Sequence, residues 1–323
     1  MTGKDTIACI ASHSALNILK GAKDEGLKTL AICRKGTTNF YKSFDVADKI
    51  IEVDNFSDIF DLQKDIEDTI VVPHGSFVAY LGMDRFLTEF YVPVFGNKEI
   101  LKWESDRNLK SKLLNESGIK TPMEFEKPED IDRPVIVKFH GARGGSGYFI
   151  AKNPEEFYER SKGEECLIQE LIIGTTMYPS YFHSKVRKRL EFFCVDRRYE
   201  SDIDSAVKID RDPTFTVVGN FPVVPRESLA VKMFDLGVGF VEATKKLTSP
   251  GVLGPFCLEL CIDSDLNMYS FEFSGRIVAG TNCFVPFSPY SYVLWGEPMS
   301  MGRRIAREVK EAISEGILDE ITS

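Results

Sequence analysis

Apolar and polar positions along the first hundred residues predict short strands separated by helices. Thr6–Ala11 is an apolar run typical of a buried strand, and Ser14–Glu25 repeats apolar residues at helical spacing. Further short apolar runs predict strands at Thr29–Cys33, Lys49–Val53, Thr69–Val72 and Tyr91–Val94. Alternating strands and helices are typical of a small parallel α/β domain.

The pattern changes near residue 120. A helix over Asn97–Ser117 is expected to end at Gly118, and hairpin-forming strands follow Thr121 and Pro122. Later helices are expected at Pro154–Lys162, Glu227–Leu247 and Met301–Glu315. The sequence therefore predicts an α/β domain over residues 1–120 and an α+β domain with antiparallel sheets over 121–323. We divide the second domain into residues 121–175 and 176–323.

A glycine-rich segment at Val135–Ala151 combines two apolar runs with a loop, and Lys138 lies in the first run. The loop holds Gly141, Gly144, Gly145 and Gly147. Glycines let backbone N–H groups approach a phosphate closely. Because Tyr148–Ile150 predicts a strand, and a Walker A motif would continue as a helix, we expect a strand–loop–strand flap that can cover a triphosphate. The alternative is an ordinary hairpin with a glycine-rich turn.

Two glutamates on neighbouring predicted strands, Glu259 and Glu272, form a second chemical signal. A four-residue loop would pair Asp263 with Met268, and hence the two glutamates with each other. Directly opposed carboxylates repel each other, and a divalent cation shared with nucleotide phosphates would remove that repulsion. We therefore predict a metal site at this pair, with Arg276 on the same face as Glu272. A solvated charged face in another register is the alternative.

Three further polar or mixed segments are less specific signals, and each has an ordinary structural interpretation. Leu167–Ile173 is either a core strand or a strand whose backbone groups bind an adenine edge. The polar run Asp196–Ser201 follows the strand Leu190–Cys194 and is typical of a solvated loop rich in ion pairs. Gly219–Pro222 predicts a turn whose asparagine, Asn220, contacts a ligand or only forms the turn.

Two polar turns lie where a strand is expected to lead into a helix. They are Ser12–Ser14 and Pro73–Ser76, and each contains a histidine. A serine there can cap the helix, or the helix N-terminus can bind an anion or another polar ligand. The similarity of the two turns favours the second interpretation.

Composition narrows the classes of function. The 323 residues carry a net charge of −9, which argues against nonspecific binding to nucleic acid or to an anionic membrane. No apolar stretch is long enough to span a bilayer, and the N-terminus has no signal-peptide pattern. The seven cysteines are scattered and odd in number, as expected for reduced thiols in a cytoplasmic protein.

Segments along the whole chain together resemble one enzyme family. They are A-S-H-S-A-L-N-I-L-K-G-A-K-D-E-G (11–26), V-V-P-H-G-S-F (71–77), the stretches 95–109 and 135–149, D-R-R-Y-E-S (196–201), G-P-F-C-L-E (254–259) and the stretches 271–282 and 301–308. The glycine flap resembles the ATP-grasp superfamily. The N-terminal and 196–201 segments narrow the resemblance to FAICAR synthetase, the formate–AICAR ligase of archaeal purine biosynthesis.

The resemblance implies a pre-ATP-grasp domain followed by an ATP-grasp fold, and it implies roles for individual residues. ATP would be bound by Arg107, Lys138, Gly141, Gly144, Gly145, Gly147, Gln169, Glu170, Leu171, Ile172 and Glu200. His13, Ser76 and Asn220 would position AICAR, and Glu259 and Glu272 would bind Mg²⁺ or Mn²⁺. Lys138 and Arg276 would be catalytic, with Arg276 stabilising the phosphoryl group during transfer.

The activity implied by this resemblance is ATP- and formate-dependent formylation of AICAR through formyl phosphate, without folate and by a homo-oligomer. The link over residues 201–219 is shorter than expected for the family, so the acceptor stays open. One alternative is an ATP-grasp ligase or kinase acting on another small carboxylate or phosphorylated acceptor. Another is a non-catalytic nucleotide-binding sensor, although Lys138, Glu259, Glu272 and Arg276 are all present.

Overall fold

The structure, a computed structural model, describes residues 5–139, 147–201 and 216–323. Its first sheet is parallel, with the strand order β3-β2-β1-β4. The strands are β1 (Thr6–Ile10), β2 (Lys28–Arg34), β3 (Lys49–Val53) and β4 (Thr69–Val71). The helices around it are α1 (Ala15–Asp24), α2 (Thr38–Lys42), α3 (Gly75–Tyr80) and α4 (Met83–Glu89). Short 3-10 turns cover Phe56–Phe60, Gln63–Asp65, Pro128–Asp130 and Leu318–Glu320.

Two sequence predictions in this part are wrong. Tyr91–Val94 forms no strand and contributes only an isolated bridge between Val94 and Val71, because Pro93 has no N–H to donate to a ladder. The expected single helix over 97–117 is two helices, α5 (Lys98–Ser105) and α6 (Arg107–Glu116). Asp106 between them is extended, and its side chain accepts the Leu109 N–H at 2.9 Å, which caps α6.

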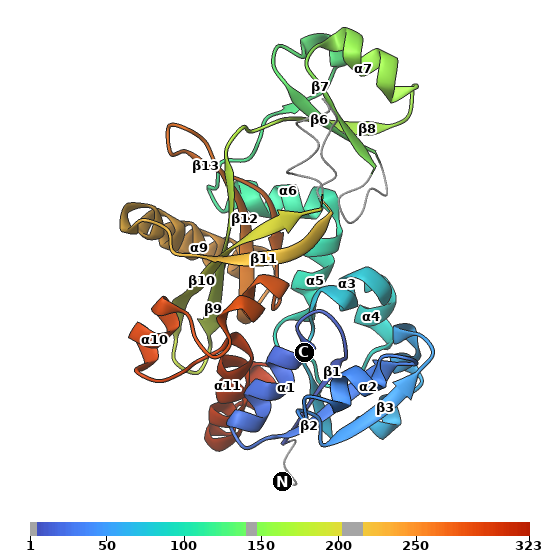
Figure 1. The fold of residues 1–323 in the computed structure, drawn as a ribbon, viewed down its shortest axis with the longest axis vertical. Helices are drawn as coiled ribbons and strands as arrows, with labels where there is room; N and C mark the ends of the chain where they lie inside the picture. Colours follow the sequence, from blue (N-terminus) through green and yellow to red (C-terminus); the bar gives the residue numbers. More distant parts are fainter. Residues whose placement is uncertain (1–4, 140–146, 202–215) are drawn as a thin grey trace.

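A small antiparallel sheet, called the flap sheet below, has the order β5-β8-β6-β7. Its strands are β5 (Glu124–Phe125), β6 (Val135–Phe139), β7 (Tyr148–Ala151) and β8 (Cys166–Glu170). The helix α7 (Pro154–Ser161) packs on it and completes a separate apolar cluster that includes Val137, Phe149 and Phe157. Figure 1 shows this unit at one end of the molecule. A strand therefore does follow the glycine loop, as the sequence predicts.

The third sheet, called the central sheet below, is antiparallel with the order β11-β10-β9-β12-β13. Its strands are β9 (Thr175–Ser184), β10 (Arg189–Glu200), β11 (Val217–Val223), β12 (Gly254–Ile262) and β13 (Met268–Ser274). Two predictions fail here. The polar run 196–201 is mostly the second half of β10, and Gly219–Pro222 lies within β11. Cross-strand pairing between these two segments overrides their turn-forming composition.

The remaining helices are α9 (Glu227–Leu247), α10 (Pro289–Trp295) and α11 (Met301–Glu315), with a 3-10 turn at Ala279–Phe284. Helix α11 lies against α1, near the opposite end of the molecule from the flap sheet (Figure 1). A Cβ atom on Gly302 would lie 1.9 Å from the Asn17 carbonyl oxygen, so the two helix backbones touch. The chain end also pairs with the first part of the chain, because Val94 and Ser323 exchange two backbone hydrogen bonds of 3.0 and 2.9 Å.

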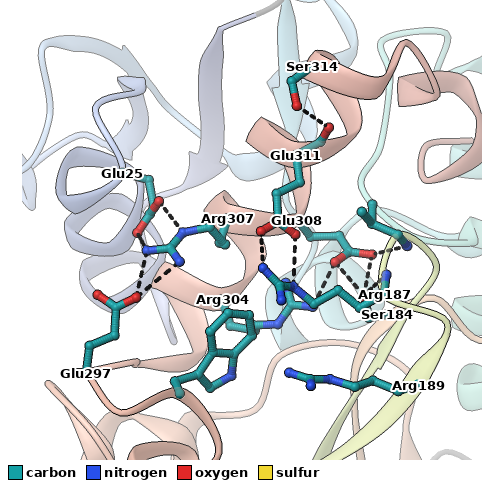
Figure 2. A network of polar contacts seen from close by, with 12 residues as sticks. Glu25, Ser184, Arg187, Arg189, Glu297, Arg304, Arg307, Glu308, Glu311 and Ser314 are labelled. Carbon is teal, nitrogen blue, oxygen red and sulfur yellow. Dashed lines mark hydrogen bonds and ion pairs between the residues drawn. The ribbon is translucent and has the colours of Figure 1, made fainter.

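Buried ion pairs connect α11 to the rest of the molecule (Figure 2). Arg303 and Arg307 both bind Glu25 at the end of α1. Arg304, whose side chain is completely buried, binds Glu191 of β10 and Glu308 within α11. One apolar core therefore includes residues from α1, the parallel sheet and α11. The proposed limits at residues 120 and 175 stay predictions from the sequence.

The predicted fold class is confirmed, with a parallel α/β part followed by antiparallel sheets. Within the described ranges, no helix is both long and apolar enough to cross a lipid bilayer. All seven cysteines are free thiols.

Candidate active site

A cavity of about 400 Å³ opens beside the central sheet and collects five of the residues predicted from the sequence. These residues are His13, Asn220, Glu259, Glu272 and Arg276. Among the lining residues that sequence reasoning did not select as ligands, four are charged or aromatic, namely Glu104, Tyr178, Asp196 and Arg198. The other predicted residues that the structure describes lie outside this lining. Gly141, Gly144 and Gly145 fall outside the described ranges.

The predicted opposition of Glu259 and Glu272 is confirmed, although the loop assumed for it is not. Met268 pairs with Ile262 and not with Asp263, so the register near the turn is shifted by one residue. An irregularity next to Glu259 restores the predicted register, because Leu260 pairs with Ser270 whereas Glu259 pairs with Glu272. A β-bulge therefore places the two carboxylates opposite each other.

A separate cation neutralises each carboxylate of this pair. Glu259, only 3% exposed, is held by both terminal nitrogens of Arg198, with Nη1 2.7 Å from Oε2. The Arg198 guanidinium also lies 4.1 Å from the centre of the Tyr178 ring. Glu272 forms an ion pair with Lys110 of α6. Partial burial raises the pKa of Glu272, but Lys110, Arg198 and Lys138 outweigh it, so this pKa lies below its usual value.

Lys138 lies at the boundary between the flap sheet and the central sheet. Its ammonium donates to Gln169 Oε1 at 2.9 Å. Burial lowers the pKa of Lys138, and the positive charges of Arg107 and Lys110 lower it further, whereas Glu272 opposes the shift. Three cations and one carboxylate thus act on each other here. An anionic group placed among them would relieve the repulsion between the cations.

Arg107 begins α6 and reaches the end of β6. Its Nη2 donates to the Phe139 carbonyl oxygen at 3.3 Å, whereas the buried Nη1 has no hydrogen-bond partner within the described ranges. A buried guanidinium N–H without a partner is costly. Gly147, with φ of +79°, closes the flap hairpin where its carbonyl oxygen accepts the Phe139 N–H at 3.0 Å. The Nη1 group of Arg107 could therefore donate a hydrogen bond to a phosphate oxygen beside the flap sheet.

The segment predicted to bind adenine forms the end of β8 and the residues after it. The Glu170 N–H donates to the Met123 carbonyl oxygen at 2.7 Å, and the Leu171 N–H donates to the Pro134 carbonyl oxygen at 2.9 Å. The Glu170 carboxylate accepts from the Met123 N–H and from Arg133. These contacts hold the end of β8 in place, and they occupy the backbone N–H groups of Glu170 and Leu171. Glu200, 6% exposed, ends β10 and pairs in register with Val217.

Glu104 of α5 holds Arg276 in place. One carboxylate oxygen accepts from Arg276 Nε at 3.1 Å and from Nη2 at 2.8 Å, while the other accepts the Gly275 N–H at 2.9 Å. Glu104 is 6% exposed. Burial raises the pKa of Glu104, although Arg276 and the Gly275 N–H oppose the shift. Sequence reasoning missed this residue because an isolated glutamate in a helix carries no motif.

The two histidine turns, which the sequence marked only as similar, meet at the cavity edge. The rings of His13 and His74 stack with centroids 5.4 Å apart, and the Ser12 and Ser76 hydroxyls are 2.6 Å apart. A Cβ on Gly75 would lie 2.8 Å from His13 Nε2, so the glycine leaves room for that ring.

His74 is completely buried and neutral. Its Nε2 lies 2.8 Å from the Ile10 carbonyl oxygen, and its Nδ1 accepts the Ser76 N–H at 3.3 Å, which together require the Nε2–H tautomer. Burial lowers the pKa of His74 to about 4, with Arg276 contributing. Enclosure by the cavity wall, with Arg276, His74 and Arg198 nearby, also lowers the pKa of His13. His74 therefore supports the wall, while His13 faces the cavity.

The polar part of β10 contributes the least expected members of the wall. Residues 196, 198 and 200 are more buried than residues 197 and 199 between them, which is the alternation of a strand with one face covered. The sequence has no matching alternation of polar and apolar residues, because Arg197 is charged like Asp196 and Arg198, so only the folded strand groups Asp196, Arg198 and Glu200 on one face. Asp196 accepts from Asn220 Nδ2 at 2.8 Å across the β10–β11 pairing.

Comparison with known proteins identifies the family. A "Protein of unknown function (DUF1246)" profile matches residues 7–125, and a "Domain of unknown function (DUF1297)" profile matches residues 153–323. The chain is 48% identical to 5-formaminoimidazole-4-carboxamide-1-(beta)-D-ribofuranosyl 5'-monophosphate synthetase from Archaeoglobus fulgidus, over 98% of this chain and 94% of the relative. The chain belongs to this synthetase family.

Solved structures agree with this assignment. The IMP biosynthesis protein PurP from Thermococcus kodakaraensis is 34% identical to this family member, with a TM-score of 0.83 over 98% of this chain and all of the other. N5-carboxyaminoimidazole synthetase from Staphylococcus aureus, solved with ADP, is 16% identical with a TM-score of 0.62, covering 87% of this chain and 73% of the other. The second likeness shows a shared fold.

Proposed function

We propose that this chain uses ATP and formate to convert AICAR into FAICAR in IMP biosynthesis, releasing ADP and phosphate. The observation that carries this proposal is the 48% identity to a named synthetase over nearly the whole of both chains. The cavity supports it, because predicted acceptor-binding, carboxylate and arginine side chains from distant parts of the sequence line one space.

The reaction divides into two displacements. A formate oxygen attacks the γ-phosphorus of ATP, the bond to the β-phosphate oxygen breaks, and ADP leaves. The AICAR amine then attacks the formyl carbon of formyl phosphate, the carbon–oxygen bond breaks, and the amine loses a proton as phosphate departs. Formate is a poor acyl donor, so activation by ATP replaces a folate carrier. Phosphoryl transfer mainly requires positioning and neutralisation of charge.

The cations at the boundary between the two sheets would bind the triphosphate. Lys138 and Arg107 would contact its oxygens, and the flap with Gly141, Gly144, Gly145 and Gly147 would cover it. The buried Nη1 of Arg107, which has no hydrogen-bond partner among the residues that the structure describes, supports a role in binding an anion. The segment Gln169–Ile172 would hold the adenine, and Glu200 would contact ATP.

Arg276 would stabilise the phosphoryl group during transfer, since Glu104 fixes its guanidinium in the cavity wall. His13, Ser76 and Asn220 would position AICAR. In support, His13 and Asn220 line the cavity, whereas Ser76 lies outside the lining with its hydroxyl 2.6 Å from that of Ser12, the residue before His13.

Glu259 and Glu272 would hold Mg²⁺ or Mn²⁺. The donor set fits such hard cations, which take one or two carboxylates together with nucleotide phosphates. Arg198 donates one hydrogen bond to each oxygen of Glu259, and each oxygen has a second lone pair that could face a cation. The metal would neutralise charge on the phosphates; the flap would exclude water from formyl phosphate.

One assay tests the proposal. The purified chain is incubated with ATP, Mg²⁺, formate and AICAR, and ADP and formylated product are measured together with single omissions. We expect ADP and product in equal amounts, and no product without formate or AICAR. ADP release that ignores both omissions would contradict the proposal. Retained ATP binding without turnover would favour a nucleotide sensor.

We further propose that the chain forms a homo-oligomer. Helix α9 exposes Val231, Phe234 and Val238 at a spacing that places them along one side, with exposed fractions of 62%, 38% and 42%. An apolar stripe of this kind is typical of an interaction surface. Light scattering coupled to size exclusion measures the mass directly, and a monomeric mass would contradict this proposal.

A further inference from the structure

Asp196 is a buried acid in the cavity wall, and only one of its two carboxylate oxygens has a hydrogen-bond donor among the described residues. The residue is 1% exposed and lies in the part of β10 that pairs with β9 and β11. Its Oδ2 accepts from Asn220 Nδ2 at 2.8 Å. Its Oδ1 is buried and has no hydrogen-bond partner within the described ranges.

The surroundings of Asp196 are built to admit its carboxylate. A Cβ on Gly280 would lie 2.0 Å from Oδ1, so no other residue type fits at 280 without displacing the acid. The nearest guanidinium, that of Arg198, is committed to Glu259. A buried carboxylate oxygen without a donor is unfavourable, so this oxygen is suited to a donor that arrives with a ligand.

Asn220 is oriented by the same contact. Because its Nδ2 points to Asp196, its Oδ1 is on the opposite side of the amide and is a second hydrogen-bond acceptor. No protein donor to this atom is found within the described ranges. Two neighbouring acceptors in a cavity wall select for N–H or O–H donors and disfavour carboxylate or phosphate oxygens.

We propose that Asp196, oriented against Asn220, accepts a hydrogen bond from an N–H group of the acceptor substrate and thereby helps to select it. This inference rests on the proposed function, in which the acceptor is an aminoimidazole carboxamide. That molecule has two N–H donors on adjacent ring carbons, the exocyclic amine and the carboxamide. A carboxylate in place of the carboxamide would be repelled by the negative charge of Asp196.

The test measures equilibrium binding of AICAR to the full chain by calorimetry. In Asp196→Asn, the new amide oxygen can still accept from Asn220, which turns its NH₂ group toward the position of the ligand N–H. Because donor then faces donor, we expect AICAR affinity to fall about 10- to 100-fold. Asp68→Asn, the same change at an exposed site in the turn before β4, is the matched control and should bind AICAR like the wild type.

Two analogues identify the N–H group in the wild-type chain. One lacks the exocyclic amine, and the other carries a 4-carboxylate in place of the carboxamide. The analogue that lacks the N–H group bound by Asp196 should bind the wild-type chain at least about 100-fold more weakly than AICAR does. If the carboxamide N–H is the partner of Asp196, the affinity of the carboxylate analogue relative to AICAR should be higher in Asp196→Asn than in the wild type, and the other analogue should show no such gain.

The inference is overturned if both analogues bind the wild type within about threefold of AICAR, a result that holds even if the variant fails to fold. It is also overturned if folded Asp196→Asn binds AICAR like the wild type. Normal formylation with unchanged AICAR affinity in that variant would overturn this inference alone. A wild-type chain that does not bind AICAR would overturn the proposed function as well.

Discussion

The Glu104→Gln substitution gives the sharpest test of how the site is held together. Glu104 fixes Arg276 through two N–H donors on one oxygen and accepts the Gly275 N–H on the other. A glutamine keeps a neutral oxygen for Arg276 but places an NH₂ group opposite the Gly275 N–H. The substitution changes charge and hydrogen bonding while preserving the shape of the side chain.

The expected cost follows from these contacts. Replacing charge-assisted hydrogen bonds to a buried guanidinium by neutral ones costs about 1–2 kcal/mol, and two facing N–H donors cost about 1–2 kcal/mol more. We therefore expect the free energy of unfolding to fall by about 2–4 kcal/mol. Because Arg276 then loses its fixed position, kcat should fall about 10- to 100-fold.

Urea unfolding measures the first quantity, and ADP release with formate and AICAR measures the second. Glu116→Gln on the exposed side of α6 is the control, and it should change neither quantity. If Glu104→Gln unfolds within about 0.5 kcal/mol of the wild type and turns over normally, Glu104 does not hold Arg276 as inferred.

Three further outcomes are expected. Glu272→Gln should reduce ADP release at least about 100-fold, yet change the free energy of unfolding by less than about 1 kcal/mol, since its pair with Lys110 is partly exposed; near-normal turnover would contradict the metal assignment. Arg304→Met should lower the free energy of unfolding by about 3–5 kcal/mol in urea, because Glu191 then stays buried without the buried cation that it binds; an unchanged midpoint would refute this. Burial keeps the pKa of His74 near 4, below its unfolded value, so the unfolded chain binds more protons than the folded chain between about pH 4 and 6.5. The free energy of unfolding should therefore decrease as pH falls through this range, by up to about 1.4 kcal/mol per pH unit. His74→Gln should flatten this dependence, and an identical slope in urea titrations at several pH values would exclude His74 as its source.

Local pattern was sufficient for most elements and for part of the site. The helices over Glu227–Leu247 and Met301–Glu315 have the predicted bounds. Apolar spacing marks both, and Ser300 and Gly316 also cap the second. The opposition of Glu259 and Glu272 was also predictable, since the two strands are consecutive and share a short turn. The bulge that realigns them was not predictable from the turn length.

Composition misled where pairing between strands decided the structure. The charged run after Cys194 has the residues of a loop, but its alternate positions are covered on one face and it continues β10. Gly219 and Pro222 have the residues of a turn, but they lie in an edge strand paired with that run. In both cases a distant partner outweighed local preference.

The sequence by itself determined the order of most elements and the two sheet types, and it singled out a lysine, an arginine and two paired carboxylates as candidate site residues. The tertiary structure decided which partner each of those groups has. Lys110 meets Glu272 across 162 residues, and Glu104 meets Arg276 across 172. Asp196 packs against Gly280, and its Oδ1 has no hydrogen-bond partner in the described parts of the chain. Periodicity acts over a few residues, whereas burial and electrostatic pairing act between elements that only the folded chain brings together.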